Sequence, residues 1–82
     1  MNLTILTPEQ EVFKGLVKSV KVPAIGGQFE ILSKHAPVVA ALEKGNVRVI
    51  DTKGESKTYS ILDGYVEVLN DEVVLLVGAI EN

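Results

Sequence analysis

The feature that most constrains this chain is a series of short apolar runs, each ended by a turn signal after roughly 8–12 residues. Val and Ile together number 19 residues, against 15 for Leu, Ala and Met. β-Branched side chains fit a pleated sheet and lose rotamer freedom in a helix. The pattern predicts a single all-β domain over residues 1–82, an antiparallel sandwich or barrel of short strands.

The turn signals divide the chain into expected strands, which cover residues 2–7, 11–14, 16–22, 28–32, 46–52, 56–62, 65–69 and 72–78. Alternation places several apolar side chains on one inward face, namely Leu3, Ile5, Phe29, Ile31, Val47, Val49, Tyr59 and Ile61. Asn70 and Asp71 form an expected two-residue turn.

Residues 11–22 read as two strands or as one long bent strand, with a bulge or tight turn at Gly15. Within this segment the alternation directs Leu16, with Val20 and Val22, into the core. It directs Ser19 and Lys21 to solvent.

Two further segments leave alternatives open. Residues 38–42 fit a buried strand or a short helix that begins at Pro37 and ends at Gly45, because periodicity does not separate the two in short apolar runs. Asp63 and Gly64 fit a hairpin turn or a bulge in a continuing strand.

Composition excludes several classes of function. The chain has no cysteine and one histidine, His35, which excludes thiolate metal sites, cysteine nucleophiles and multi-histidine sites within one chain. The net charge is −3 and the sequence has no basic patch, so nucleic acid is not an expected partner. No apolar run approaches the roughly 20 residues of a membrane-spanning helix, and no secretory signal is expected at the N-terminus.

Candidate catalytic residues are few. Ser33 or Ser60 could be combined with His35 and Asp63, but no nucleophile motif accompanies them. The pair Gly26-Gly27 lacks the Gly-Lys-Ser/Thr ending of a phosphate-binding loop. We therefore expect a scaffold or adaptor that is not an enzyme and that carries no cofactor or metal.

Residues 22–37 carry a family resemblance. The segment resembles the signature region of the epsilon subunit of rotary ATP synthases, and the matching positions are Gly27, Ile31, Leu32, His35, Ala36 and Pro37. Residues 3–8 with 13–15, residues 42–49 and residues 63–68 resemble the flanking regions of that family, so the resemblance covers nearly the whole chain. The sequence departs from the family pattern at Gln28, where Glu is usual, at Glu30, where Gly is usual, and at Lys34, where Gly or Asn is usual.

The resemblance implies an antiparallel β-sandwich of about 8–10 short strands in two sheets, and it favours a strand at residues 38–42. It implies a non-catalytic subunit of the central stalk that binds the gamma shaft and the polar loops of the membrane rotor ring and so couples proton flow to ATP synthesis. The implied location is peripheral, on the cytoplasmic face of a bacterial inner membrane or its organelle equivalent. Most members continue into a pair of C-terminal helices, for which these 82 residues have no counterpart.

The expected partner interface consists of Gln28, Glu30, Ile31, Ser33, Lys34, His35, Ala36 and Pro37. Within it, Glu30 is expected to meet a basic group of the ring, standing in for the acidic side chain that the family carries two residues earlier. Two alternatives remain, a generic sandwich adaptor and a lipoyl- or biotinyl-carrier domain. The carrier-domain hypothesis is the weaker one, because Lys34, Lys44, Lys53 and Lys57 lack the flanking Asp or Met that a modified lysine would have.

Overall fold

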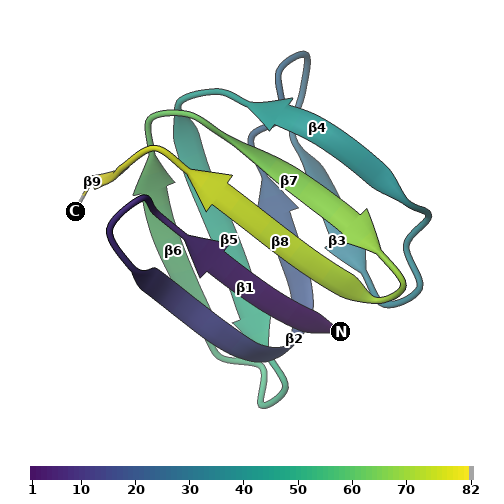
Figure 1. Cartoon of the computed structure of the whole chain (residues 1–82). Coiled ribbons are helices and arrows are strands. Elements are labelled where there is room, and N and C mark those ends of the chain that lie inside the picture. The colour runs from purple at the N-terminus through teal and green to yellow at the C-terminus, as the bar shows by residue number, and fades with distance from the viewer. Residues whose placement is uncertain (82) are drawn as a thin grey trace.

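A computed structural model describes residues 1–81, and within them the chain forms nine strands and no helix (Figure 1). The strands are β1 (Asn2–Leu6), β2 (Glu11–Val22), β3 (Phe29–Leu32), β4 (Val38–Leu42), β5 (Gly45–Asp51), β6 (Ser56–Ile61), β7 (Gly64–Leu69), β8 (Glu72–Val77) and β9 (Ile80–Glu81). The all-β prediction is confirmed. The ambiguous segment at residues 38–42 is a strand, and β9 is an element that the sequence patterns did not predict.

The strands form two layers that share β2. In the first layer the order is β4-β7-β8-β1 and then the N-terminal half of β2; in the second, the C-terminal half of β2 lies between β3 and β5, followed by β6 and β9. Figure 1 shows β2 passing from one layer to the other. Pairing between the strands is antiparallel, except that β1 and β8 run parallel. The predicted antiparallel sandwich therefore contains one parallel pair.

The core lies between the layers and is built almost entirely from aliphatic side chains. Strand alternation supplies it as predicted, because Leu3, Ile5, Ile31, Val47, Val49, Tyr59 and Ile61 are all buried. Each buried side chain of this size contributes roughly 1.5–3 kcal/mol relative to an exposed position. Within the described residues, Ser19 is the one polar residue in the buried set.

Strand β2 carries two bulges, and both lie away from Gly15. The pairing with β1 shifts register at Val12, and the pairing with β5 shifts at Lys18. An extra residue reverses which side chains face the core. Leu16 is therefore 61% exposed and Ser19 is buried, which is the reverse of the prediction for both residues.

The connections after β3, β4, β6 and β8 carry the chain between the layers. Residues 33–37 lead from β3 in the second layer to β4 in the first, and Leu62 and Asp63 lead from β6 to β7. Asp63 and Gly64 therefore form neither a hairpin turn nor a bulge, since β6 and β7 lie in different layers. The predicted turn at Asn70 and Asp71 is confirmed, and both residues have positive φ (51° and 63°), as in the turn type that suits two-residue hairpins.

Candidate functional site

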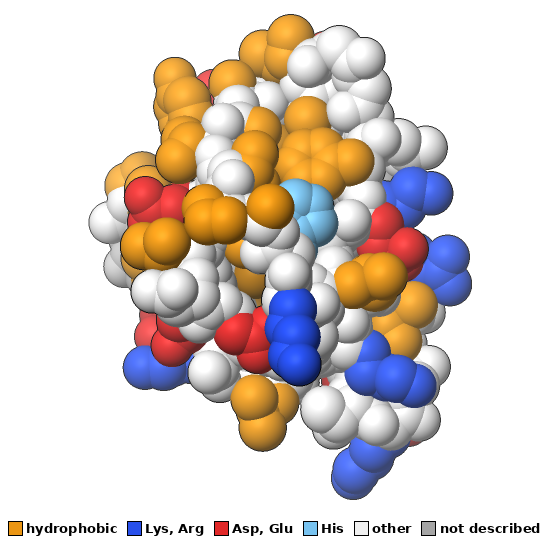
Figure 2. Space-filling model, turned by 90° about the vertical axis from the view of Figure 1, so that its right-hand side faces the viewer, with side chains coloured by type: hydrophobic (Ala, Val, Ile, Leu, Met, Phe, Trp, Pro, Cys, Tyr) orange, Lys and Arg blue, Asp and Glu red, His pale blue; other side chains and the backbone are white. Residues whose placement is uncertain are grey.

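The residues predicted to form the interface follow β3 and the connection from β3 to β4, with Gln28 directly before the strand. Exposed side chains are supplied by Gln28, Glu30, Ser33, Lys34, Ala36 and Pro37, and His35 is half-buried. Figure 2 shows the side of the molecule that carries the histidine, with hydrophobic side chains above it and to its left and charged side chains of both signs further out. The structure thus brings most of the predicted residues together on one continuous surface.

Ile31 is the exception. Its side chain is completely buried in the core, because alternation along β3 directs it inward with Phe29 while Glu30 and Leu32 point to solvent. A side chain without exposed area cannot contact a partner on this surface. The prediction of Ile31 as an interface residue is corrected on this ground, and its role is to hold β3 against the core.

The β3–β4 connection begins with a tight turn. The His35 N–H donates to the Leu32 carbonyl at 3.1 Å, and Lys34 has a φ of 66°. A positive φ at the third turn position is typical of type II turns, which usually carry Gly or Asn there. The Lys34 N–H donates to the Asp71 carboxylate at 3.1 Å, so the turn is attached to the β7–β8 hairpin.

The histidine ring makes local contacts only. Its Nδ1 lies 2.7 Å from the Ala36 carbonyl oxygen, which can only accept, so Nδ1 is the donor. The ring centroid lies 6.0 Å from that of Phe29, at an interplanar angle of 32°. No hydrogen bond among residues 1–81 joins His35 to Ser33, Ser60 or Asp63, and Ser60 Oγ instead donates to Asn46 at 2.9 Å. The arrangement holds the ring in place and provides no activated nucleophile.

Three exposed apolar side chains extend this surface beyond the predicted set. Leu32 is 53% exposed, Leu69 51% and Val39 68%. A shallow hollow of about 300 Å³ adjoins the loop and is lined by Pro37, Val38, Val39, Glu67, Val68 and Leu69. The outward position of Leu32 follows from the alternation of β3 and was available from the sequence. The contribution of Leu69 to this surface could not be predicted from the sequence, because it depends on how β7 pairs with β4.

Charged side chains form a row across the outer face of the second layer. Glu30 on β3 lies directly opposite Lys21 on β2, and Lys21 lies opposite Arg48 on β5. All three residues are exposed. Opposite charges on facing strands attract, whereas like charges repel. Glu30 therefore belongs to a mixed-charge row in which it is the only acid beside two cations.

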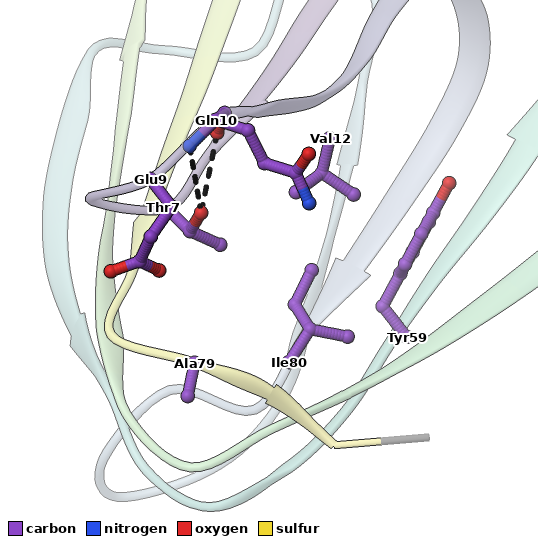
Figure 3. A pocket seen from close by; sticks show the side chains of 7 residues that line it. All are labelled: Thr7, Glu9, Gln10, Val12, Tyr59, Ala79 and Ile80. Carbon is purple, nitrogen blue, oxygen red and sulfur yellow. Dashed lines mark hydrogen bonds between the residues drawn. The ribbon is translucent and has the colours of Figure 1, made fainter.

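A second hollow lies far from the predicted interface. At the opposite end of the sandwich a hollow of about 330 Å³ is lined by Thr7, Glu9, Gln10, Val12, Tyr59, Ala79 and Ile80 (Figure 3). The Thr7 hydroxyl closes the adjacent turn by accepting from the Gln10 N–H at 3.2 Å. In the described part of the chain, no group of three or more His, Asp or Glu side chains could hold a metal ion, and no helix is long and apolar enough to cross a membrane.

Comparison with known families decides between the alternatives. The family described as "ATP synthase, Delta/Epsilon chain, beta-sandwich domain" matches residues 1–82. The chain belongs to this family. The predicted membership and the sandwich fold are thereby confirmed, and the carrier-domain alternative falls away.

Curated relatives and solved structures agree with this assignment. An ATP synthase epsilon chain from Protochlamydia amoebophila is 38% identical over 80 residues, covering 98% of this chain and 54% of the relative. One from Chlorobaculum tepidum is 38% identical over 75 residues, covering 92% of this chain and 85% of the relative. The chain thus spans about half of the first relative and most of the second.

Among solved structures, a chain of the Euglena gracilis mitochondrial ATP synthase superposes with a TM-score of 0.91 at 20% identity, covering 96% of this chain and 51% of that one. A chain from the central stalk and c-ring of the Tetrahymena thermophila mitochondrial ATP synthase superposes with a TM-score of 0.82 at 18% identity, covering 99% and 65%. At these identities the likeness concerns the fold.

Proposed function

We propose that this chain is a central-stalk component of a proton-translocating ATP synthase that binds the gamma shaft and the polar loops of the membrane rotor ring. In this role it makes shaft and ring turn together and so couples proton flow to ATP synthesis. The family match over all 82 residues carries the proposal. Its location would be peripheral, on the cytoplasmic face of a bacterial inner membrane or the equivalent organelle membrane.

The partner surface consists of the outer side of β3, the β3–β4 connection and the exposed side chains beside that connection. Its members are Gln28, Glu30, Leu32, Ser33, Lys34, His35, Ala36, Pro37, Val39 and Leu69, which are exposed or half-buried. An apolar centre with charged groups around it is the usual composition of a protein–protein interface. Two hydrogen bonds hold the turn at residues 32–35 in one conformation, which lowers the ordering cost of binding.

Glu30 is the acidic group that meets a basic group of the ring in this proposal. Glu30 is the one acidic side chain of the row, and a basic group of the ring competes with the facing Lys21 for it. An ion pair at the rim of an interface affects the association rate and the salt dependence more than the final affinity.

The test is the charge reversal Glu30→Lys in the assembled complex, beside Glu55→Lys as a matched control. Glu55 is also an exposed glutamate, but it lies in the β5–β6 hairpin, outside the proposed surface. We expect Glu30→Lys to lower complex recovery and proton-driven ATP synthesis at least about threefold, and to leave the isolated chain folded, since exposed substitutions usually cost within about 0.5 kcal/mol. Equal behaviour of the two variants would show that the contact surface lies elsewhere.

A further inference from the structure

Lys34 has a backbone conformation that its residue type rarely adopts. Three non-glycine residues of the described chain have positive φ, namely Lys34, Asn70 and Asp71. Asn and Asp tolerate the left-handed region because their short side chains form local hydrogen bonds, but lysine has no such help. The conformation of Lys34 therefore needs support from outside its own residue.

That support comes from a distant part of the chain. Asp71, 37 residues further on, accepts the Lys34 N–H on Oδ1 at 3.1 Å. The middle amide of such a turn has no partner within the turn, so an outside carboxylate can select the left-handed conformation by binding it. A hydrogen bond to an ionised carboxylate is roughly twice as strong as one between neutral groups.

Asp71 is itself well fixed. Its carbonyl oxygen accepts the Asn2 N–H at 3.0 Å, and Oδ2 lies 3.6 Å from the Met1 α-ammonium group. It also occupies the second position of the β7–β8 turn, where its φ of 63° suits that turn. The carboxylate thus joins the β3–β4 turn to the sheet at the paired ends of β1 and β8.

We propose that Asp71 is a positioning residue of the partner surface, which holds Lys34 in the left-handed conformation and so presents the loop at residues 33–37 in its binding form. The Lys34 side chain then projects from the turn as an exposed cation suited to an acidic group of the partner. Only the identity of the partner in this inference depends on the proposed function. The attachment of the loop to Asp71 is a property of the chain alone.

Asp71→Gly and Asn70→Gly are matched variants that test the attachment. Both replace an Asx residue of positive φ by glycine in the same turn, but only the first removes the acceptor of the Lys34 N–H. In Asp71→Gly we expect the Lys34 amide to exchange with solvent at least about tenfold faster, and in Asn70→Gly at an unchanged rate. Asp71→Asn keeps an acceptor oxygen and should retain most of the protection. An unchanged Lys34 exchange rate in Asp71→Gly would overturn the proposal.

A second arm measures binding of each variant to the shaft subunit and, separately, to the rotor ring. We expect Asp71→Gly to raise the dissociation constant about fivefold for the partner that contacts the loop, and Asn70→Gly to leave it unchanged. Faster Lys34 exchange with unaltered binding would also overturn the positioning role. If the unsubstituted chain binds neither partner, the proposed function fails, and Lys34 exchange still decides whether Asp71 holds the turn.

Discussion

Ile31 and Leu32 are adjacent in sequence, and alanine substitutions at the two positions should have opposite consequences. Ile31 is completely buried and Leu32 is 53% exposed on the proposed partner surface. We expect Ile31→Ala to lower stability without altering the surface that a partner meets. We expect Leu32→Ala to weaken partner binding at little cost to stability.

The magnitudes follow from burial. Ile31→Ala removes three carbon groups worth about 0.8 kcal/mol each and leaves a partly unfilled cavity, so the free energy of unfolding should fall by about 3 kcal/mol. An unfolding entropy of about 2.1 cal/mol/K per residue makes this a fall of roughly 15–20 °C in Tm for a chain of 82 residues. Leu32→Ala loses only part of one side chain's burial and should cost less than about 1 kcal/mol.

Thermal unfolding followed by circular dichroism measures the first effect, and binding to the shaft subunit and the rotor ring near 15 °C measures the second. Domains of this kind are close to their maximum stability at about that temperature, so Ile31→Ala should still be folded there. A variant Ile31→Ala that lost binding while its Tm fell by less than about 5 °C would refute the burial argument. If Ile31→Ala and Leu32→Ala lost binding equally while both were fully folded, the burial argument would be refuted as well.

Two further predictions concern the framework. Gly64→Ala should lower the free energy of unfolding by about 2 kcal/mol, because a Cβ there would lie 2.5 Å from the Leu76 carbonyl oxygen of the adjacent strand. The control Gly15→Ala should be neutral or slightly stabilising, because its Cβ would meet only the Phe13 ring at 3.6 Å. Equal denaturant midpoints for the two variants would contradict this prediction. Asp51→Ala should cost about 1 kcal/mol in a urea titration, because its carboxylate accepts the N–H groups of Lys53 and Glu55 at 2.8 and 3.0 Å, and Asp51→Asn should recover most of the loss.

The sequence predicted those parts of the fold that depend on local alternation. Leu3 and Ile5, or Val47 and Val49, are inward-facing because their strands are regular. Leu16 was misplaced because the bulge at Lys18 depends on how β2 pairs with β5, which no local pattern records. The connection at Asp63 and Gly64 was wrongly predicted for the same reason. A turn signal shows where a strand ends, but it does not show with which strand the following strand pairs.

The candidate site also has a part that local sequence predicts and a part that depends on strand pairing. Gln28, Glu30 and residues 33–37 are close in sequence, so their common surface could be predicted from the chain and its resemblance to a family. Leu69 and Asp71 join that surface only through the pairing of β7 with β4 and of β1 with β8. The hydrogen bond from Lys34 to Asp71 spans 37 residues and had no sequence signal.

The parallel pairing of β1 with β8 has a consequence for how the chain acquires its structure during synthesis. Asn2 pairs with Glu72 and Leu6 with Leu76, so β1 finds its second neighbour only after every strand from β2 to β7 has been synthesised. The β5–β6 hairpin joins neighbouring segments and can form much earlier, because closing a short loop loses little entropy. Folding should therefore finish in one late cooperative step, on the millisecond-to-second scale typical of β-sandwiches. Until that step, the apolar side chains of β1 remain open to other chains.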